Sequence, residues 1–305
     1  MVSPRAGSTS ATVPWWVGGY VCVHLSKCLR GPFGGARLCG VADARVQELL
    51  TTSGVVFVRD VFSSDAAAAM RDAVWRRIEG YTTACRDHPE TWTSVRLPSF
   101  QPIKQRSVFR AFIASAALRS SLDAIFGPGS WHQSGRGVQV LFTFPNTDRW
   151  TLPHELWHID SSFGPVAPTT TVKVFCCVDN VDVGGGGTLA LAGSHRFADR
   201  YSVGLRVEQR AGNTAAWRRC LNTDSWTREL IRAGREPERT ERMMTASHDA
   251  DGIELGIVEM TGEPGDVYIT DIHTFHCVAP NASGRPRIML GALFQRTATS
   301  SAVQT

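Results

Sequence analysis

The sequence predicts an α+β protein with a mainly β core, in which helices come first and an antiparallel sandwich or barrel follows. Up to about residue 127, apolar residues recur at the spacing of amphipathic helices. From Val138 the pattern changes to short β-branched and aromatic runs that are broken by Gly, Pro, Asn and Asp. Helices followed by many short strands are typical of this fold class.

The first expected elements are two helices and a strand. A short amphipathic helix begins near Ala42 and stops at Gly54, and the β-branched, aromatic run 55–58 that follows it is expected to be a strand. Ser63 is suited to cap the next helix, because its hydroxyl can accept a hydrogen bond from a free N–H group of the first turn. That helix is expected to run through Ile78.

A third helix is expected from about Ile113 to Phe126, because Gly127 is suited to be its C-cap. The predicted strands then lie at 138–144, 170–178, 187–191, 266–270 and 287–294. A polar, Arg-rich stretch, 197–262, interrupts these strands. Its length indicates an insertion over one end of the barrel, and such insertions are often lids.

We expect one ordered domain over residues 43–298, with a segment before it and a tail, 299–305, after it. The preceding residues 1–42 contain no Asp or Glu and are rich in Ser and Gly. This composition fits an organelle transit peptide, an unstructured tail or a start codon assigned too far upstream.

Composition excludes several classes of partner. The net charge is only +4, and the basic residues are scattered Arg rather than a cluster, so nucleic acid is not an implied partner. The eight Cys form no C-x-x-C pair, which indicates reduced thiols and a cytoplasmic protein. No apolar run approaches the ~20 residues that cross a bilayer, so no membrane partner is expected.

The most informative spacing is that of His158 and Asp160. On a strand, residues i and i+2 project to the same face, so one imidazole and one carboxylate can reach a common ion. The spacing alone is a weak signal, since a surface His and a turn Asp produce it by chance. Two His and one carboxylate leave metal positions open, which an Fe(II) centre needs to bind a chelating co-substrate and O2.

The second His is expected in the block that begins with the Gly265-Asp266 turn. A strand would aim His273 and His276 at opposite faces, so only one can be a ligand. We choose His276, because a turn and a closing strand that begins near Arg287 follow it. A hairpin there would bring the guanidinium back towards the metal, where it could grip a carboxylate through two parallel hydrogen bonds. The alternative for Arg287 is a surface charge.

With these residues, the chain resembles the phytanoyl-CoA dioxygenase family of iron- and 2-oxoglutarate-dependent oxygenases over roughly residues 45–296. The resemblance rests on 53–59, the His158 and Asp160 pair, 187–196 and 265–287. It implies a double-stranded β-helix, a jelly-roll or cupin-like barrel with flanking N-terminal helices. Its reaction would use O2 and release succinate and CO2.

The resemblance also implies roles for individual residues. The Fe(II) ligands would be His158, Asp160 and His276. Arg287 would anchor the distal carboxylate of 2-oxoglutarate, while Gln139 and Thr143 look like the residues that face this co-substrate in relatives. Two departures stand out: Cys277-Val278 replaces a common Gly-Ser, and an aromatic residue of the strand after Asp160 is either Phe175 or is lost to Cys176.

The substrate is expected to be a small-molecule metabolite. Asp160 is retained where related halogenases have a small residue, so hydroxylation, desaturation or ring formation is favoured over halogenation. Trp157 and Phe163 are candidates to line the substrate pocket. Two rival interpretations stay open: a non-catalytic, cupin-like binding protein, and a metalloenzyme that uses the same three ligands without 2-oxoglutarate and so has no use for Arg287.

Overall fold

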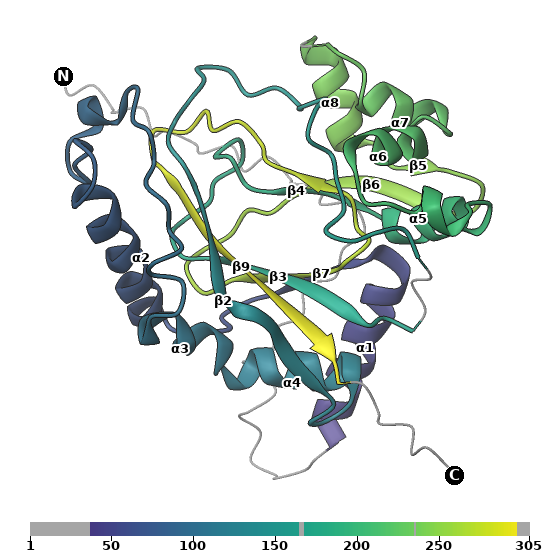
Figure 1. Ribbon diagram of the computed structural model, residues 1–305, viewed down its shortest axis with the longest axis horizontal. Coiled ribbons are helices and arrows are strands. Elements are labelled where there is room, and N and C mark those ends of the chain that lie inside the picture. Colours follow the sequence, from purple (N-terminus) through teal and green to yellow (C-terminus); the bar gives the residue numbers. More distant parts are fainter. Residues whose placement is uncertain (1–36, 165–167, 235, 298–305) are drawn as a thin grey trace, which may run out of the picture.

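The structure is a computed structural model that describes residues 37–164, 168–234 and 236–297. The core consists of two antiparallel sheets (Figure 1). The larger sheet has the order β1-β7-β3-β9-β2, formed by Val55–Val58, Val267–Asp271, Thr171–Cys177, Arg287–Arg296 and Trp131–Thr143. The smaller sheet has the order β5-β6-β4-β8, formed by His248–Asp249, Glu254–Glu259, Leu189–Ala192 and His276–Cys277. The α+β class with a mainly β core is confirmed.

The first four helices cover the outer face of the larger sheet. They are α1 (Arg37–Ser53), α2 (Ser64–Glu79), α3 (Arg110–Ile113) and α4 (Ala116–Phe126), and they are joined by the short 3-10 helices Pro89–Trp92 and Ser107–Phe109. Val172 and Val174 of β3 pack with Met70 of α2 and Leu118 of α4 in one apolar cluster. The outward-facing residues of the strands therefore form the main core together with these helices.

Helix boundaries follow local capping. Ser63 caps α2 as predicted, since its side chain accepts a hydrogen bond from the Ala66 amide. Gly127, with φ of +93°, ends α4. The helix expected from about Ile113 to Phe126 is confirmed as α4, but it begins at Ala116, because Ser115 is its N-cap and accepts a hydrogen bond from the Leu118 amide. The first helix begins at Arg37 rather than near Ala42, and residues 1–36 and the tail 299–305 lie outside the described residues.

The remaining helices cover the smaller sheet. These are α5 (Ser194–Val203), α6 (Thr214–Leu221), α7 (Ser225–Leu230) and α8 (Pro237–Thr245), with a 3-10 turn at Val207–Gln209. They gather around β4, β5 and β6 on the side of the molecule away from α2 and α3 (Figure 1). The stretch 197–262 also contains β6, a strand not predicted from the sequence, which pairs with β4 along its length.

The space between the two sheets holds a separate cluster. Phe175, Tyr268 and Met289 of the larger sheet meet Ala190 and Val258 of the smaller one. Successive side chains of a strand point to opposite faces, so the neighbours of the residues that pack against the helices point into this interior. The inner face of the larger sheet therefore carries the following polar residues: Gln139, Thr143, Lys173 and Arg287.

None of the helices in the described parts of the chain combines the length and apolar character needed to span a membrane.

Candidate metal centre

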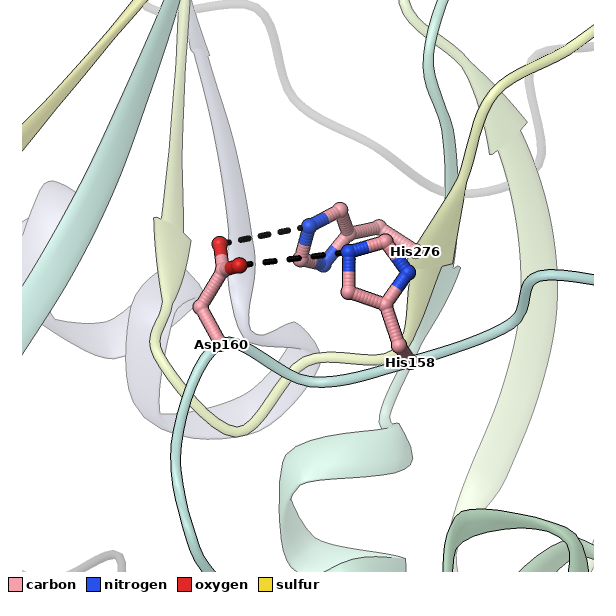
Figure 2. A group of neighbouring side chains, drawn as sticks. All are labelled: His158, Asp160 and His276. Atoms are coloured by element: carbon pink, nitrogen blue, oxygen red, sulfur yellow. Dashed lines mark ion pairs between the residues drawn. The ribbon is translucent and has the colours of Figure 1, made fainter. Parts of the chain in front are cut away.

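His158, Asp160 and His276 lie together in the described structure. One ligand atom of each residue lies within 4.8 Å of those of the other two. Figure 2 shows the carboxylate of Asp160 facing both imidazole rings, with Asp160 Oδ2 3.3 Å from His276 Nε2 and Oδ1 3.9 Å from His158 Nε2. The three side chains that were singled out from the sequence therefore form one compact group.

A pair of backbone hydrogen bonds brings the two His side by side. The His158 amide donates to the His276 carbonyl at 3.0 Å, and the His276 amide donates to the His158 carbonyl at 2.9 Å. This exchange is an isolated antiparallel bridge, and it leaves the ring centroids 4.3 Å apart. The expectation that His158 and Asp160 share a strand is wrong, because only His158 is bridged and Asp160 lies in a bend.

Both imidazoles are oriented by the same device. His158 Nδ1 lies 2.7 Å from the carbonyl oxygen of Leu156, and His276 Nδ1 lies 3.0 Å from that of Thr274. A carbonyl oxygen can only accept, so each Nδ1 carries the hydrogen and each Nε2 presents a lone pair. Both lone pairs belong to the atoms that face Asp160, as metal ligation requires.

The electrostatics favour the ligating forms of His158 and Asp160. Burial, followed by the neighbouring His276, lowers the pKa of His158, which favours the neutral imidazole. Burial opposes ionisation of Asp160, but His276, when its ring is protonated, and the Lys173 ammonium outweigh it and hold the pKa of this carboxyl well below its ordinary value. Two imidazoles and one carboxylate match the donor set of a non-haem Fe(II) site with open positions.

Arg287 is buried, so its interpretation as a surface charge is wrong. Its side chain lies opposite Thr143 in the β2–β9 pair, and Nη2 donates to Thr143 Oγ1 at 2.8 Å. The residue is 3% exposed, and its Nε and Nη1 atoms have no hydrogen-bond partner among the described residues. Burial lowers the pKa of the guanidinium to about 10, so it stays charged at neutral pH. A buried cation with two unused donors fits a carboxylate ligand.

Gln139 lies next to a cavity of about 650 Å³ that reaches the metal group. Asp160 and Lys173 also line this cavity, whereas Arg287 and Thr143 do not. Gln139 and Thr143 share the inner face of β2, as predicted, but they face different parts of the interior.

Trp157 and Phe163, the candidates to line the substrate pocket, are not among the residues that line this cavity. Trp157 is buried in the cluster beneath α5 to α8, and its indole N–H donates to the Pro153 carbonyl at 3.1 Å. Phe163 is buried in the same cluster, and its ring lies 5.4 Å from that of Tyr201. Both residues pack in this cluster, and their role in binding substrate stays a prediction.

Two further residues of the centre were not found from the sequence. Lys173 Nζ lies 2.6 Å from Asp160 Oδ2. The ring of Trp217, from α6, lies 5.6 Å from that of His158, and its indole nitrogen is buried with no hydrogen-bond partner among the described residues. The one sequence signal for Lys173 is a charged residue inside the otherwise apolar run 172–178.

The sequence profile of the family described as phytanoyl-CoA dioxygenase (PhyH) matches residues 50–289, most of the chain. The chain belongs to this family. Membership makes it an oxidoreductase that uses Fe(II), 2-oxoglutarate and O2. No curated protein has a matching sequence.

Solved structures of low sequence identity share the fold. The epimerase SnoN, in complex with Fe3+, α-ketoglutarate and nogalamycin RO, has a TM-score of 0.50 and 16% identity, over 86% of this chain and 89% of SnoN. EvdMO1 has a TM-score of 0.51 and 17% identity, over 84% of this chain and 50% of EvdMO1.

The phytanoyl-CoA dioxygenase resemblance left the aromatic residue after Asp160 undecided between two positions. Phe175 faces the interior, and its ring lies 5.6 Å from that of His276 in an edge-on arrangement. Cys176 faces the opposite way, into the helix-covered core. Phe175 therefore provides the aromatic contact beside the metal group.

Proposed function

We propose that this chain is an Fe(II)- and 2-oxoglutarate-dependent dioxygenase that oxidises a small-molecule metabolite, with release of succinate and CO2. His158, Asp160 and His276 hold the iron, and Arg287 binds the distal carboxylate of the co-substrate. The observation that carries this proposal is the pairing of a three-ligand group with a buried arginine that has two unused donors. A binding protein or a metalloenzyme without 2-oxoglutarate has no use for that arginine.

Each of these side chains has a defined task. The carbonyls of Leu156 and Thr274 hold the two imidazoles in the ligating tautomer. Thr143 fixes the Arg287 guanidinium so that its remaining N–H groups can grip a carboxylate in a bidentate manner. The rings of Phe175 and Trp217 lie beside the imidazoles of His276 and His158, respectively. Iron, when bound, supplies the oxidative chemistry with O2.

Asp160 bears on the reaction type. As the third protein ligand it occupies the position that a halide needs, which favours hydroxylation, desaturation or ring formation. The fold also accommodates epimerisation, because the similar structure of SnoN is that of an epimerase. Hydroxylation is the outcome that we propose first.

The stretch 197–262 covers the centre in this proposal. The Phe163 amide, close after Asp160, donates to the Arg210 carbonyl at 2.9 Å. Trp217 lies against His158. Both contacts join this stretch to the segment that carries two of the ligands, so we assign it the role of a lid.

Anaerobic reconstitution with Fe(II) and 2-oxoglutarate tests the proposal. We expect a visible metal-to-ligand charge-transfer band, and succinate release when O2 is admitted. Arg287→Met should weaken 2-oxoglutarate binding at least tenfold, because a charged, bidentate contact is lost. The matched control is Arg285→Met, whose side chain is 52% exposed and pairs with Asp182. A wild-type protein that binds iron but gives no band would overturn the use of 2-oxoglutarate.

A further inference from the structure

Lys173 is a buried cation on the inner face of β3. It is 7% exposed, and the strands on either side place Thr270 and Leu293 opposite it. Its Nζ atom lies 2.6 Å from Asp160 Oδ2 and 4.8 Å from the centre of the Phe175 ring. Asp160 is the one hydrogen-bond partner of this ammonium within the described ranges.

Lys173 and a metal ion need the same carboxylate. Asp160 is the only anionic ligand of the three-residue group. Once a divalent cation binds there, the negative charge that Lys173 faces is neutralised, and the ammonium is left beside a dication. A buried charge without a partner is strongly unfavourable, so the ammonium then requires another anion.

The adjoining cavity is the space in which such an anion can lie. It measures about 650 Å³, a size typical of small-molecule sites. Its charged lining residues are Lys173, Lys104 and Asp160, so it becomes purely cationic when a metal takes Asp160. The Gln139 amide also lines it, and apolar walls at Leu97 and Phe100 complete it. One ammonium at the inner wall, with an amide nearby, suits a singly charged carboxylate.

We propose that Lys173 is the receptor for a carboxylate group that enters this cavity when a metal ion occupies His158, Asp160 and His276. This inference rests on the proposed function for the metal site. The carboxylate belongs either to 2-oxoglutarate or to the molecule that is oxidised, and the chemistry of recognition is the same for both. Arg287 is a separate anion site, since it does not line the cavity.

Metal-free protein gives the first test, because it requires no iron chemistry. The probes are phenylacetate and its neutral analogue 2-phenylethanol, with binding followed by ligand-observed NMR. In the wild type, the Lys173 ammonium is paired with the Asp160 carboxylate, so we expect both probes to bind weakly. Asp160→Asn keeps the shape but removes the charge, and it should tighten phenylacetate binding at least tenfold with no change for 2-phenylethanol.

The tighter binding of phenylacetate to Asp160→Asn must depend on Lys173. Adding Lys173→Met to Asp160→Asn should abolish the gain, whereas adding Lys104→Met, at the same cavity, should leave most of it. Lys173→Gln replaces Lys173→Met if thermal unfolding shows that the methionine variant does not fold. If Asp160→Asn has no effect on phenylacetate, or if the gain survives loss of Lys173, the proposal is overturned.

Fe(II)-loaded protein then identifies the source of the carboxylate. If the carboxylate belongs to 2-oxoglutarate, Lys173→Met raises its anaerobic Kd at least tenfold. If it belongs to the oxidised molecule, that Kd changes less than twofold, and the complex with Fe(II) and 2-oxoglutarate loses its preference for phenylacetate over 2-phenylethanol. If Lys173→Met changes neither the Kd of 2-oxoglutarate nor the preference for phenylacetate, Lys173 is not the carboxylate receptor. Absence of the charge-transfer band in the wild type would contradict the proposed function alone, because the metal-free test still decides the role of Lys173.

Discussion

His158 and His276 are 118 positions apart, yet each donates its backbone N–H to the carbonyl of the other. This bridge joins the segment after β2 to strand β8 at the point where both imidazoles face Asp160. Coordination of one metal ion by all three side chains would therefore tie together two segments that are distant in the sequence. Folding stability and metal binding are coupled as a result.

Metal ions should stabilise the folded chain. The ligand group exists only in the folded state, so a metal at 100 times its Kd is expected to add about 2.7 kcal/mol to the free energy of unfolding. Differential scanning fluorimetry with and without chelator measures this as a shift in Tm. Asp160→Ala should remove the shift, and Asp182→Ala, which changes a half-exposed carboxylate that pairs with Arg285 and is not one of the three ligands, should retain it.

Leu156 adopts a left-handed conformation, with φ of +64°, and the residue is 71% exposed. Leu156→Gly should relieve the strain, so stability should change by about 1 kcal/mol or less and metal affinity should be retained. Leu156→Pro fixes φ near −65° and should displace the carbonyl that orients His158, which we expect to weaken metal binding about 10- to 100-fold. Titration with Zn(II) or Co(II) checks both. Equal metal affinity in the two variants would show that this carbonyl does not position the ligand.

Thr143 is the single hydrogen-bond partner of the Arg287 guanidinium within the described ranges. Thr143→Val preserves the shape but leaves Nη2 unsatisfied, so the free energy of unfolding should fall by about 1–3 kcal/mol. The Kd of 2-oxoglutarate should rise as well, because the guanidinium is no longer held in place. Urea denaturation and an anaerobic titration measure the two effects, and bound 2-oxoglutarate should restore part of the lost stability.

Glu259 gives a pH dependence with a defined sign. Burial raises its pKa from 4.5 to about 7, against the lowering effect of hydrogen bonds from the Gly184 and Gly187 amides. The folded protein keeps the proton while the unfolded chain releases it, so stability is lost as the pH rises from about 4.5 to 7. Glu259→Gln should therefore stabilise the protein by about 1–3 kcal/mol at pH 8 and have little effect at pH 4. Urea denaturation at both pH values provides the measurement, and equal effects at the two would contradict it.

Much of the candidate centre could be predicted from the sequence, because its signals are local. The pair His158 and Asp160 and the block that contains His276 are short motifs that the sequence shows directly. The strand geometry used to argue from them was wrong, because Asp160 lies in a bend and His273 lies in the turn between β7 and β8. Helix caps at Ser63 and Gly127 are also local signals. Strand β6 was not predicted, since a short run that contains Gly256 has little β signal of its own and depends on pairing with β4.

The sequence by itself determined which side chains were available and which of them shared a face of a strand. Only the tertiary structure decided what each face meets. It placed Arg287 against Thr143 in the interior and paired the Lys173 ammonium with the Asp160 carboxylate. It also packed Trp157 and Phe163 into a cluster away from the cavity. The physical reason is that these contacts join residues that are distant along the chain, so their spacing in the sequence does not show that they meet. The contacts form only when the two sheets close around a common interior.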